Sequence, residues 1–123
     1  MPNLVIASDR EFQLWKYTVG HSQLLLRSTK SPEFPTRIDV FFKGVVEIQL
    51  PTHFRGLFLT EGNEDEIAKI HTSREQLSFK EGVKVFTVRG AGFFGYVAAL
   101  VVATHEDKGE YYEPSYFAKG NII

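Results

Sequence analysis

The clearest pattern in the chain is an alternation of apolar and polar residues between positions 37 and 43. Ile38, Val40 and Phe42 alternate with charged residues at 37, 39 and 43, which is the two-residue period of a β-strand with one buried face. The same period returns in Val45–Leu50, which is followed by Pro51, a residue that cannot donate a hydrogen bond to a sheet. Arg37–Lys43 and Val45–Leu50 are therefore predicted strands.

An earlier pair of strands is predicted at Phe12–Val19 and Ser22–Arg27, joined by a turn at Gly20-His21. Glycine favours such a turn because it has no side chain to restrict the backbone. The following segment contains Pro32 and Pro35, which prevent regular strand pairing and indicate a loop.

A fifth strand is predicted at His53–Thr60, where Leu57 and Phe54 would lie on opposite faces. Gly56 interrupts this strand and indicates a bulge or a weak point. Residues 61–66 are predicted to form an acidic turn, residues 67–72 a short strand or a helical turn, and residues 73–79 a single helical turn. A Ser and a Gln three positions apart, as in a capping box, favour the last of these.

The most apolar stretch, residues 83–104, admits two interpretations. Gly90, Gly92 and Gly95 have the spacing G-x-G-x-x-G, which in dinucleotide-binding proteins lies between a strand and a helix and holds a pyrophosphate. The helix would then be Phe93–Thr104. Such a unit also requires a second parallel strand after the helix, and only 19 residues, which begin with a polar run, follow Thr104.

The alternative is a β-hairpin in which Val83–Arg89 pairs with Phe93–Thr104. The intervening glycines would supply the positive φ angles that tight hairpin turns need, and Gly95 would mark a bulge or a close approach of another backbone. Phe93–Thr104 is also rich in β-branched and aromatic residues, which favour strands. We favour the hairpin.

Seven or eight short strands with frequent turns predict an all-β fold. We expect residues 1–123 to form a single domain, an antiparallel β-sandwich or a partly open β-barrel with at most one short helix. Glu110–Tyr112 is predicted as a last short strand, followed by a C-terminal tail.

Composition excludes several function classes. The chain contains no Cys, so thiolate chemistry and zinc–thiolate sites are absent. Its net charge of −1 is unsuited to binding a phosphate backbone, and we expect no nucleic-acid partner. No segment approaches the roughly 20 apolar residues of a membrane span, and the N-terminal residues lack the features of a secretory signal. We therefore expect a cytoplasmic protein without a membrane partner.

The four histidines show no metal-ligand spacing. His21, His53, His71 and His105 form no His-x-His or His-x-x-x-His pair, so we expect neither a metal site nor a cofactor. The run 105–107 places a histidine beside two carboxylates, but adjacent strand residues point to opposite faces. A solvated charge run is the simpler interpretation, and no catalytic residue is predicted.

Several polar and aromatic residues are candidates for ligand or partner binding. Trp15 and Tyr17 would share one strand face. Arg37 and Asp39 share another, where we expect an exposed pair of small energetic value. The C-terminal tail is unusually aromatic for a disordered segment, so it would either strap across the sandwich or belong to a partner interface. The complete set of candidates is Trp15, Tyr17, His21, Arg27, Arg37, Asp39, Tyr96, Tyr111 and Tyr112.

Two stretches, residues 15–28 (WKYTVGHSQLLLRS) and residues 37–44 (RIDVFFKG), together resemble a family of small uncharacterised bacterial proteins. The resemblance covers about the first third of the chain. It implies an independent all-β bacterial domain and supplies no catalytic residue.

These observations lead to two hypotheses about function. The first is a non-enzymatic interaction domain that binds another protein or a second copy of itself through a sheet face or edge, for example an accessory or immunity-type protein. The alternative is a small-molecule-binding or enzymatic barrel with a pocket lined by Trp15, Tyr17, Arg37, Tyr96 and a histidine. A concave polar pocket of about 300 Å³ or more would favour the alternative.

Overall fold

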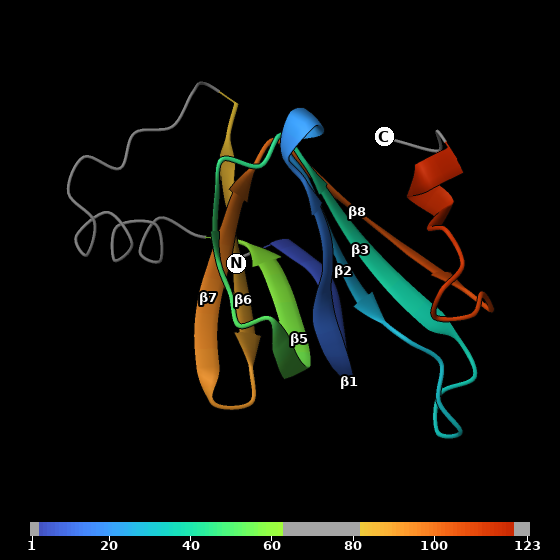
Figure 1. Cartoon of the computed structure of the whole chain (residues 1–123). Helices are drawn as coiled ribbons and strands as arrows, with labels where there is room; N and C mark the ends of the chain where they lie inside the picture. The colour runs from blue at the N-terminus through green and yellow to red at the C-terminus, as the bar shows by residue number, and fades with distance from the viewer. Residues whose placement is uncertain (1–2, 63–81, 120–123) are drawn as a thin grey trace.

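A computed structural model describes residues 3–62 and 82–119 (Figure 1). Eight antiparallel strands form one sheet in the order β4-β7-β6-β5-β1-β2-β3-β8, and two short 3₁₀ turns, η1 and η2, complete the described elements. In chain order these are β1 Asn3–Thr18, η1 Val19–His21, β2 Gln23–Ser28, β3 Arg37–Lys43, β4 Glu47–Gln49, β5 His53–Glu61, β6 Lys84–Gly90, β7 Phe93–Ala99, β8 Val101–Asp107 and η2 Tyr116–Lys119.

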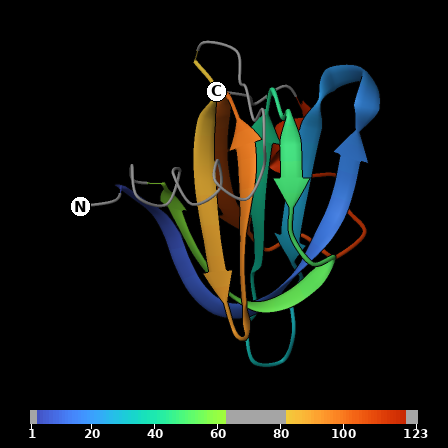
Figure 2. The same ribbon diagram turned by 90° about the vertical axis from the view of Figure 1, so that its left-hand side faces the viewer.

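The sheet is folded over so that its two halves face each other (Figures 1 and 2). One layer contains β4, β7, β6 and β5, and the other contains β2, β3 and β8. The long strand β1 belongs to both layers, because its first part pairs with β5 and its last part with β2. Since β4 and β8 remain the two edges, the fold is a sandwich-like, incompletely closed barrel, and the prediction of an all-β fold is confirmed.

The main core lies between the two layers, on what we call the inner face of the sheet. The strands contribute alternate residues to it, as their two-residue period requires. Its fully or nearly buried members are Phe12, Leu24, Leu26, Ile38, Val40, Phe42, Val45, Phe54, Leu57, Leu59, Phe86, Val88, Val97 and Ala99.

The hairpin predicted in the glycine-punctuated segment is confirmed. β6 and β7 pair along their whole length, with Gly90 opposite Phe93. Gly92 in the turn has a φ of +77°, which favours glycine. A Cβ on Gly95 would lie 2.2 Å from the carbonyl oxygen of Gln49, so this glycine permits the close approach of β4. Because residues 93–99 are extended, the helix of a dinucleotide-binding unit does not form.

The second arm of the hairpin is shorter than predicted. The apolar run breaks at Leu100, and the chain continues as β8, which pairs with β3 in the other layer. The apolar run therefore spans β7, which lies in one layer, and β8, which is the edge strand of the other layer. Val101 consequently lies half-buried in an edge strand and not in the interior.

Bulges explain two errors in the predicted faces. Gly56, with a φ of +86°, lies where the register of β5 against β1 shifts, so Phe54 joins Leu57 in the core instead of opposing it. A second register shift, between Leu14 and Lys16 of β1, separates the faces of Trp15 and Tyr17, which were predicted to be the same. A strict alternation rule fails at both points because one strand carries an extra residue.

Other boundaries also differ from the predictions. β4 comprises only Glu47–Gln49 of the predicted Val45–Leu50 strand. Residues 111–112 form a turn and not a strand, and the tail ends in η2. The turns and short elements predicted for residues 63–81 lie outside the described residues. In the described part of the chain, no helix has both the length and the apolar character that crossing a membrane requires.

Candidate functional site

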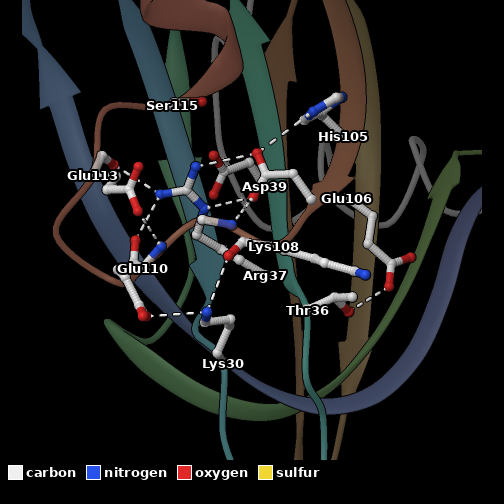
Figure 3. Close-up of polar contacts among 12 residues, drawn as sticks. Lys30, Thr36, Arg37, Asp39, His105, Glu106, Lys108, Glu110, Glu113 and Ser115 are labelled. Carbon is white, nitrogen blue, oxygen red and sulfur yellow. Dashed lines mark hydrogen bonds and ion pairs between the residues drawn. The ribbon is translucent and has the colours of Figure 1, made fainter.

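Two arginines, Arg27 and Arg37, are buried on the outer face of the layer formed by β2, β3 and β8. Figure 3 shows Arg37 and Asp39 there, beside residues of the C-terminal segment. Arg27 is 2% exposed and donates from Nε to Oδ1 of Asp39 at 2.7 Å and from Nη2 to Oδ2 at 3.0 Å. Asp39 is 1% exposed. A bidentate pair of this kind is among the stronger side-chain interactions and fixes the orientation of both groups.

Arg37 repeats this arrangement one strand farther across the sheet. It is 3% exposed, and its Nε and Nη2 each donate to the carboxylate of Asp107 at 3.1 Å. The register explains both pairs, since Arg27 lies opposite Asp39 and Arg37 lies opposite Asp107. Directly opposed residues are closer than residues two apart on one strand.

The expected exposed pair between Arg37 and Asp39 is therefore wrong. The two residues do share a face, but each bonds to a neighbouring strand, and both are buried. β3 is buried on both faces, although its alternating sequence is typical of a strand with one solvated face. The second face is buried because the C-terminal strap, which we define as residues 108–119, lies over it.

The arginines hold the strap through its main-chain carbonyls. Nη1 of Arg27 donates to the carbonyl oxygens of Tyr111 at 2.9 Å and Glu113 at 3.2 Å. Nη1 of Arg37 donates to those of Glu110 at 2.9 Å and Glu113 at 2.7 Å, and its Nη2 contacts that of Pro114 at 3.3 Å. The guanidinium groups thus bind several main-chain carbonyls of this turn, one of which, that of Glu110, also accepts from the Glu113 amide at 3.1 Å.

An apolar contact fixes the far end of the strap. Phe117 is 5% exposed and stacks on Phe41 with ring centroids 4.9 Å apart. Leu25 belongs to the same outer-face cluster, and Trp15 packs against it. The next ring, that of Tyr116, stacks on His105 at 3.9 Å. Apolar and polar contacts together place the whole strap.

The pKa of Asp107 reflects this environment. Burial alone would raise it, but hydrogen bonds from the Arg37 guanidinium and the Gly109 amide, together with the positive charges of Arg37 and His105, outweigh burial and lower it. The ionised form of Asp107 is therefore favoured in the folded protein. The carboxylates of Asp39 and Asp107 are each paired with an arginine. We call these two ion pairs, Arg27–Asp39 and Arg37–Asp107, the clamp.

The strap presents its tyrosines to solvent. Tyr111 and Tyr112 stack with centroids 5.3 Å apart and are 62% and 64% exposed, while Tyr116 is 39% exposed. The two open interpretations of the aromatic tail are thus compatible, because the segment crosses the sheet and still exposes aromatic rings.

The other predicted site residues lie elsewhere. Trp15 packs near Arg27, whose guanidinium carbon lies 5.0 Å from the indole centroid. Tyr17 does not share its face, because the bulge at residue 15 turns Tyr17 toward the side of its partner Leu24. His21 is exposed in η1. Tyr96 is buried in β7, where its hydroxyl donates to the Glu47 carboxylate.

A concave region also exists, with a volume of about 380 Å³. It lies beside β1, β2 and β5 and the loop after β2. Of the individual residues expected to line a pocket, only a histidine, His53, is present. The expected residue types are nevertheless all represented, because an aromatic ring and three arginines also line the region: Phe34, Arg10, Arg27 and Arg55. The charged groups around it include Asp9, Arg10, Glu11, Glu33, His53 and Arg55.

Sequence reasoning did not identify the residues that complete the clamp. Asp107 was interpreted as part of a solvated charge run, and the carbonyls of residues 110–114 carry no signal in side-chain chemistry. One clue was available, because His105 and Asp107 are two apart on a strand and so share a face. His105 Nε2 lies 3.5 Å from Asp107 Oδ2. Within the described ranges, 3–62 and 82–119, no three potential metal ligands gather.

Comparison with known proteins provides no further guide. No family model, no curated protein and no solved structure matches the chain.

Proposed function

We propose that this protein is a non-enzymatic, cytoplasmic binding domain that recognises another protein through the tyrosines of its C-terminal strap. The observation that carries the proposal is the stacked pair Tyr111–Tyr112, whose rings are more than 60% exposed on a segment anchored by two buried arginines. An accessory or immunity-type protein that blocks its partner is one form of this function.

Tyrosine suits such a surface for physical reasons. It offers a large contact area with only two side-chain torsions to order, and its hydroxyl can bond to a polar partner group. Tyrosine is accordingly enriched among the residues that dominate binding energies at protein interfaces. An isolated exposed aromatic ring is common on any surface, but Tyr111 and Tyr112 stack on each other and so form one contiguous aromatic surface on a fixed strap.

Anchoring the strap also favours affinity. The arginines bind the main chain of residues 110–114, so the side chains of Tyr111 and Tyr112 are not used to hold the strap. A surface already fixed in its bound conformation loses less conformational entropy on association. The clamp is thus expected to organise the surface before the partner arrives.

The proposal can be tested with the double variant Tyr111→Ser/Tyr112→Ser. Tagged wild-type and variant proteins are incubated with an extract of the source organism, and retained proteins are quantified by mass spectrometry. We expect a discrete retained protein whose recovery falls about tenfold or more in the variant, as for residues central to an interface.

Phe58→Ser/Phe94→Ser provides the matched control. Both phenylalanines are 47% exposed and lie on β5 and β7, away from the strap. This variant should retain the partner. Equal recovery by wild type and the tyrosine variant, with both folded, would contradict the proposal.

A second candidate function is supported by the concave region of about 380 Å³. Its volume falls in the range of small-molecule sites, and its mixed charges suit a small polar ligand with both acidic and basic groups. Unlike most such sites it is strongly polar, which is why we place it second.

A thermal-shift panel of amino acids, nucleotides and sugar phosphates tests this candidate. A ligand that binds only the folded state raises the melting temperature with concentration. The shift should disappear in Arg55→Ala, which changes an exposed lining residue, and persist in Arg89→Ala, which does not line this region. Shifts that are equal in both variants would exclude the cavity.

A further inference from the structure

The edge strand β8 differs from every strand inside its layer. It pairs with β3 through all seven of its residues, and no strand among residues 3–62 and 82–119 pairs with its other side. None of its residues is fully buried, whereas six of the seven residues of β3 are. An edge of this length offers a row of backbone donors and acceptors to another strand.

The first half of β8 lacks the usual protection against such pairing. Natural sheets block their edges with lysine, proline, bulges or very short strands. Val101–Thr104 contains no charge and no proline and pairs with β3 without a register shift. The opposite edge strand, β4, has only three residues, and a very short strand is one of these forms of protection.

We propose that β8 pairs antiparallel with β8 of a second copy of this chain, so that two sheets join edge to edge around a twofold axis at Thr104. Two identical antiparallel strands are self-complementary, as a twofold interface requires. The register centred on Thr104 pairs all seven residues of β8 with all seven of its symmetry mate.

The charges of β8 are compatible with the same register. With Thr104 opposite Thr104 of the second copy, Glu106 faces Val102 and Asp107 faces Val101, so no carboxylate opposes a carboxylate. A register centred on Glu106 would place two carboxylates directly opposite each other, which destabilises a cross-strand pair. Maximum overlap therefore selects the register centred on Thr104, and charge avoidance excludes the registers centred on Glu106 and Asp107.

We infer that the partner is a second copy because the side chains of this edge show no pattern that would select the strand of a different protein. Backbone pairing supplies the attraction, and specificity comes from side chains that alternate along the strand. Here Val101, Val102 and Ala103 on one side of the axis are small and uncharged, and the two carboxylates on the other side each face one of these valines. Edge pairing alone buries a modest area, so we expect a weak dimer with micromolar dissociation. The inference is independent of the tyrosine surface.

Sedimentation velocity over a concentration series, from a few micromolar to several hundred, tests the proposal with three proteins. Wild type should shift from monomer to dimer. Thr104→Lys should raise the dissociation constant roughly tenfold, because two lysines meet at the axis. Thr104→Glu should do the same, since two carboxylates then meet. Thr104 is exposed, so neither change should disturb the fold.

A sedimentation measurement on a mixture of the two variants is the most discriminating experiment. A one-to-one mixture of Thr104→Lys and Thr104→Glu should recover a dimer, since opposite charges now face each other at the axis. Gln49→Lys, which adds a lysine to the other edge strand, should dimerise as wild type does.

Three results would overturn the proposal. They are a wild-type protein that stays monomeric throughout the series, a Thr104→Lys protein that dimerises as tightly as wild type, and a mixture that remains monomeric.

Discussion

The outer face of β3 buries Arg37 and Asp39, whereas the outer faces of β5 and β7 expose Phe58 and Phe94. Both faces turn away from the core and follow the same two-residue period. The strap covers the charged face, and its main-chain carbonyls accept hydrogen bonds from the arginines of that face. On the other face Phe58 and Phe94 flank Arg89 across three adjacent strands and remain nearly half exposed. Burial is therefore decided by what lies over a face and not by the residues alone.

This difference has an energetic consequence. Substitutions in the covered face should affect stability strongly, because they leave buried groups without partners. Substitutions in the open face should affect stability little and bear mainly on binding. The following changes test that contrast, from the largest expected effect to the smallest.

Asp39→Ala should be the most destabilising change, by about 4 kcal/mol, because it leaves the Arg27 guanidinium buried without its carboxylate. Urea unfolding followed by circular dichroism measures the loss. The double variant Arg27→Met/Asp39→Leu removes both charges and should recover much of it. A single variant as stable as wild type would show that the pair is not buried in solution.

Phe117→Ala should reduce the free energy of unfolding by about 3 kcal/mol, since it removes a buried ring that stacks on Phe41. The same unfolding measurement applies. Tyr112→Ala, which removes an exposed ring of the same strap, is the control and should change stability by less than about 0.5 kcal/mol. Equal effects of the two changes would contradict the described packing of the strap.

Asp107→Asn should give a pH-dependent loss of stability. The pKa of Asp107 is lowered in the folded state from its ordinary value of 3.8, so its ionised form stabilises the protein above about pH 4, and this contribution is lost as pH falls through the folded pKa. The difference in urea midpoint between wild type and variant should be largest near neutral pH and shrink below pH 4. A difference independent of pH would exclude this ionic contribution.

Phe58→Ser and Phe94→Ser should each change the free energy of unfolding by no more than about 0.5 kcal/mol. Both rings are exposed, and neither belongs to the core. Chemical denaturation provides the measurement. A loss above about 2 kcal/mol in either variant would show that this face is covered in solution.

The sequence predicted the fold class and most strands because alternation and turn residues are local signals. The hairpin of β6 and β7 follows from its glycines, β2 from the turn that precedes it, and β3 from its two-residue period. Trp15 and Phe54 were placed wrongly because a bulge inverts every face after it, and no local signal fixed the register shift near Trp15.

The site was predicted only in part. Arg27, Arg37 and Asp39 were among the candidates predicted from the sequence, and the structure brings them together, although buried and paired across strands instead of exposed. The partners themselves depend on strand register and on carbonyls 70 or more positions away along the chain. Such long-range contacts cannot be read from a local pattern, and the cavity beside β1 and β5 has the same origin.

Hydrogen–deuterium exchange of residues 108–119 most directly tests whether buried guanidinium groups hold the strap by its main chain. In Arg27→Met/Asp39→Leu the buried charges are removed together, so the sheet should remain intact while two carbonyl contacts are lost. The account predicts faster exchange in residues 108–119 and unchanged exchange in β2 and β3. Unchanged exchange in the strap would contradict it, as would an equal rise throughout the sheet.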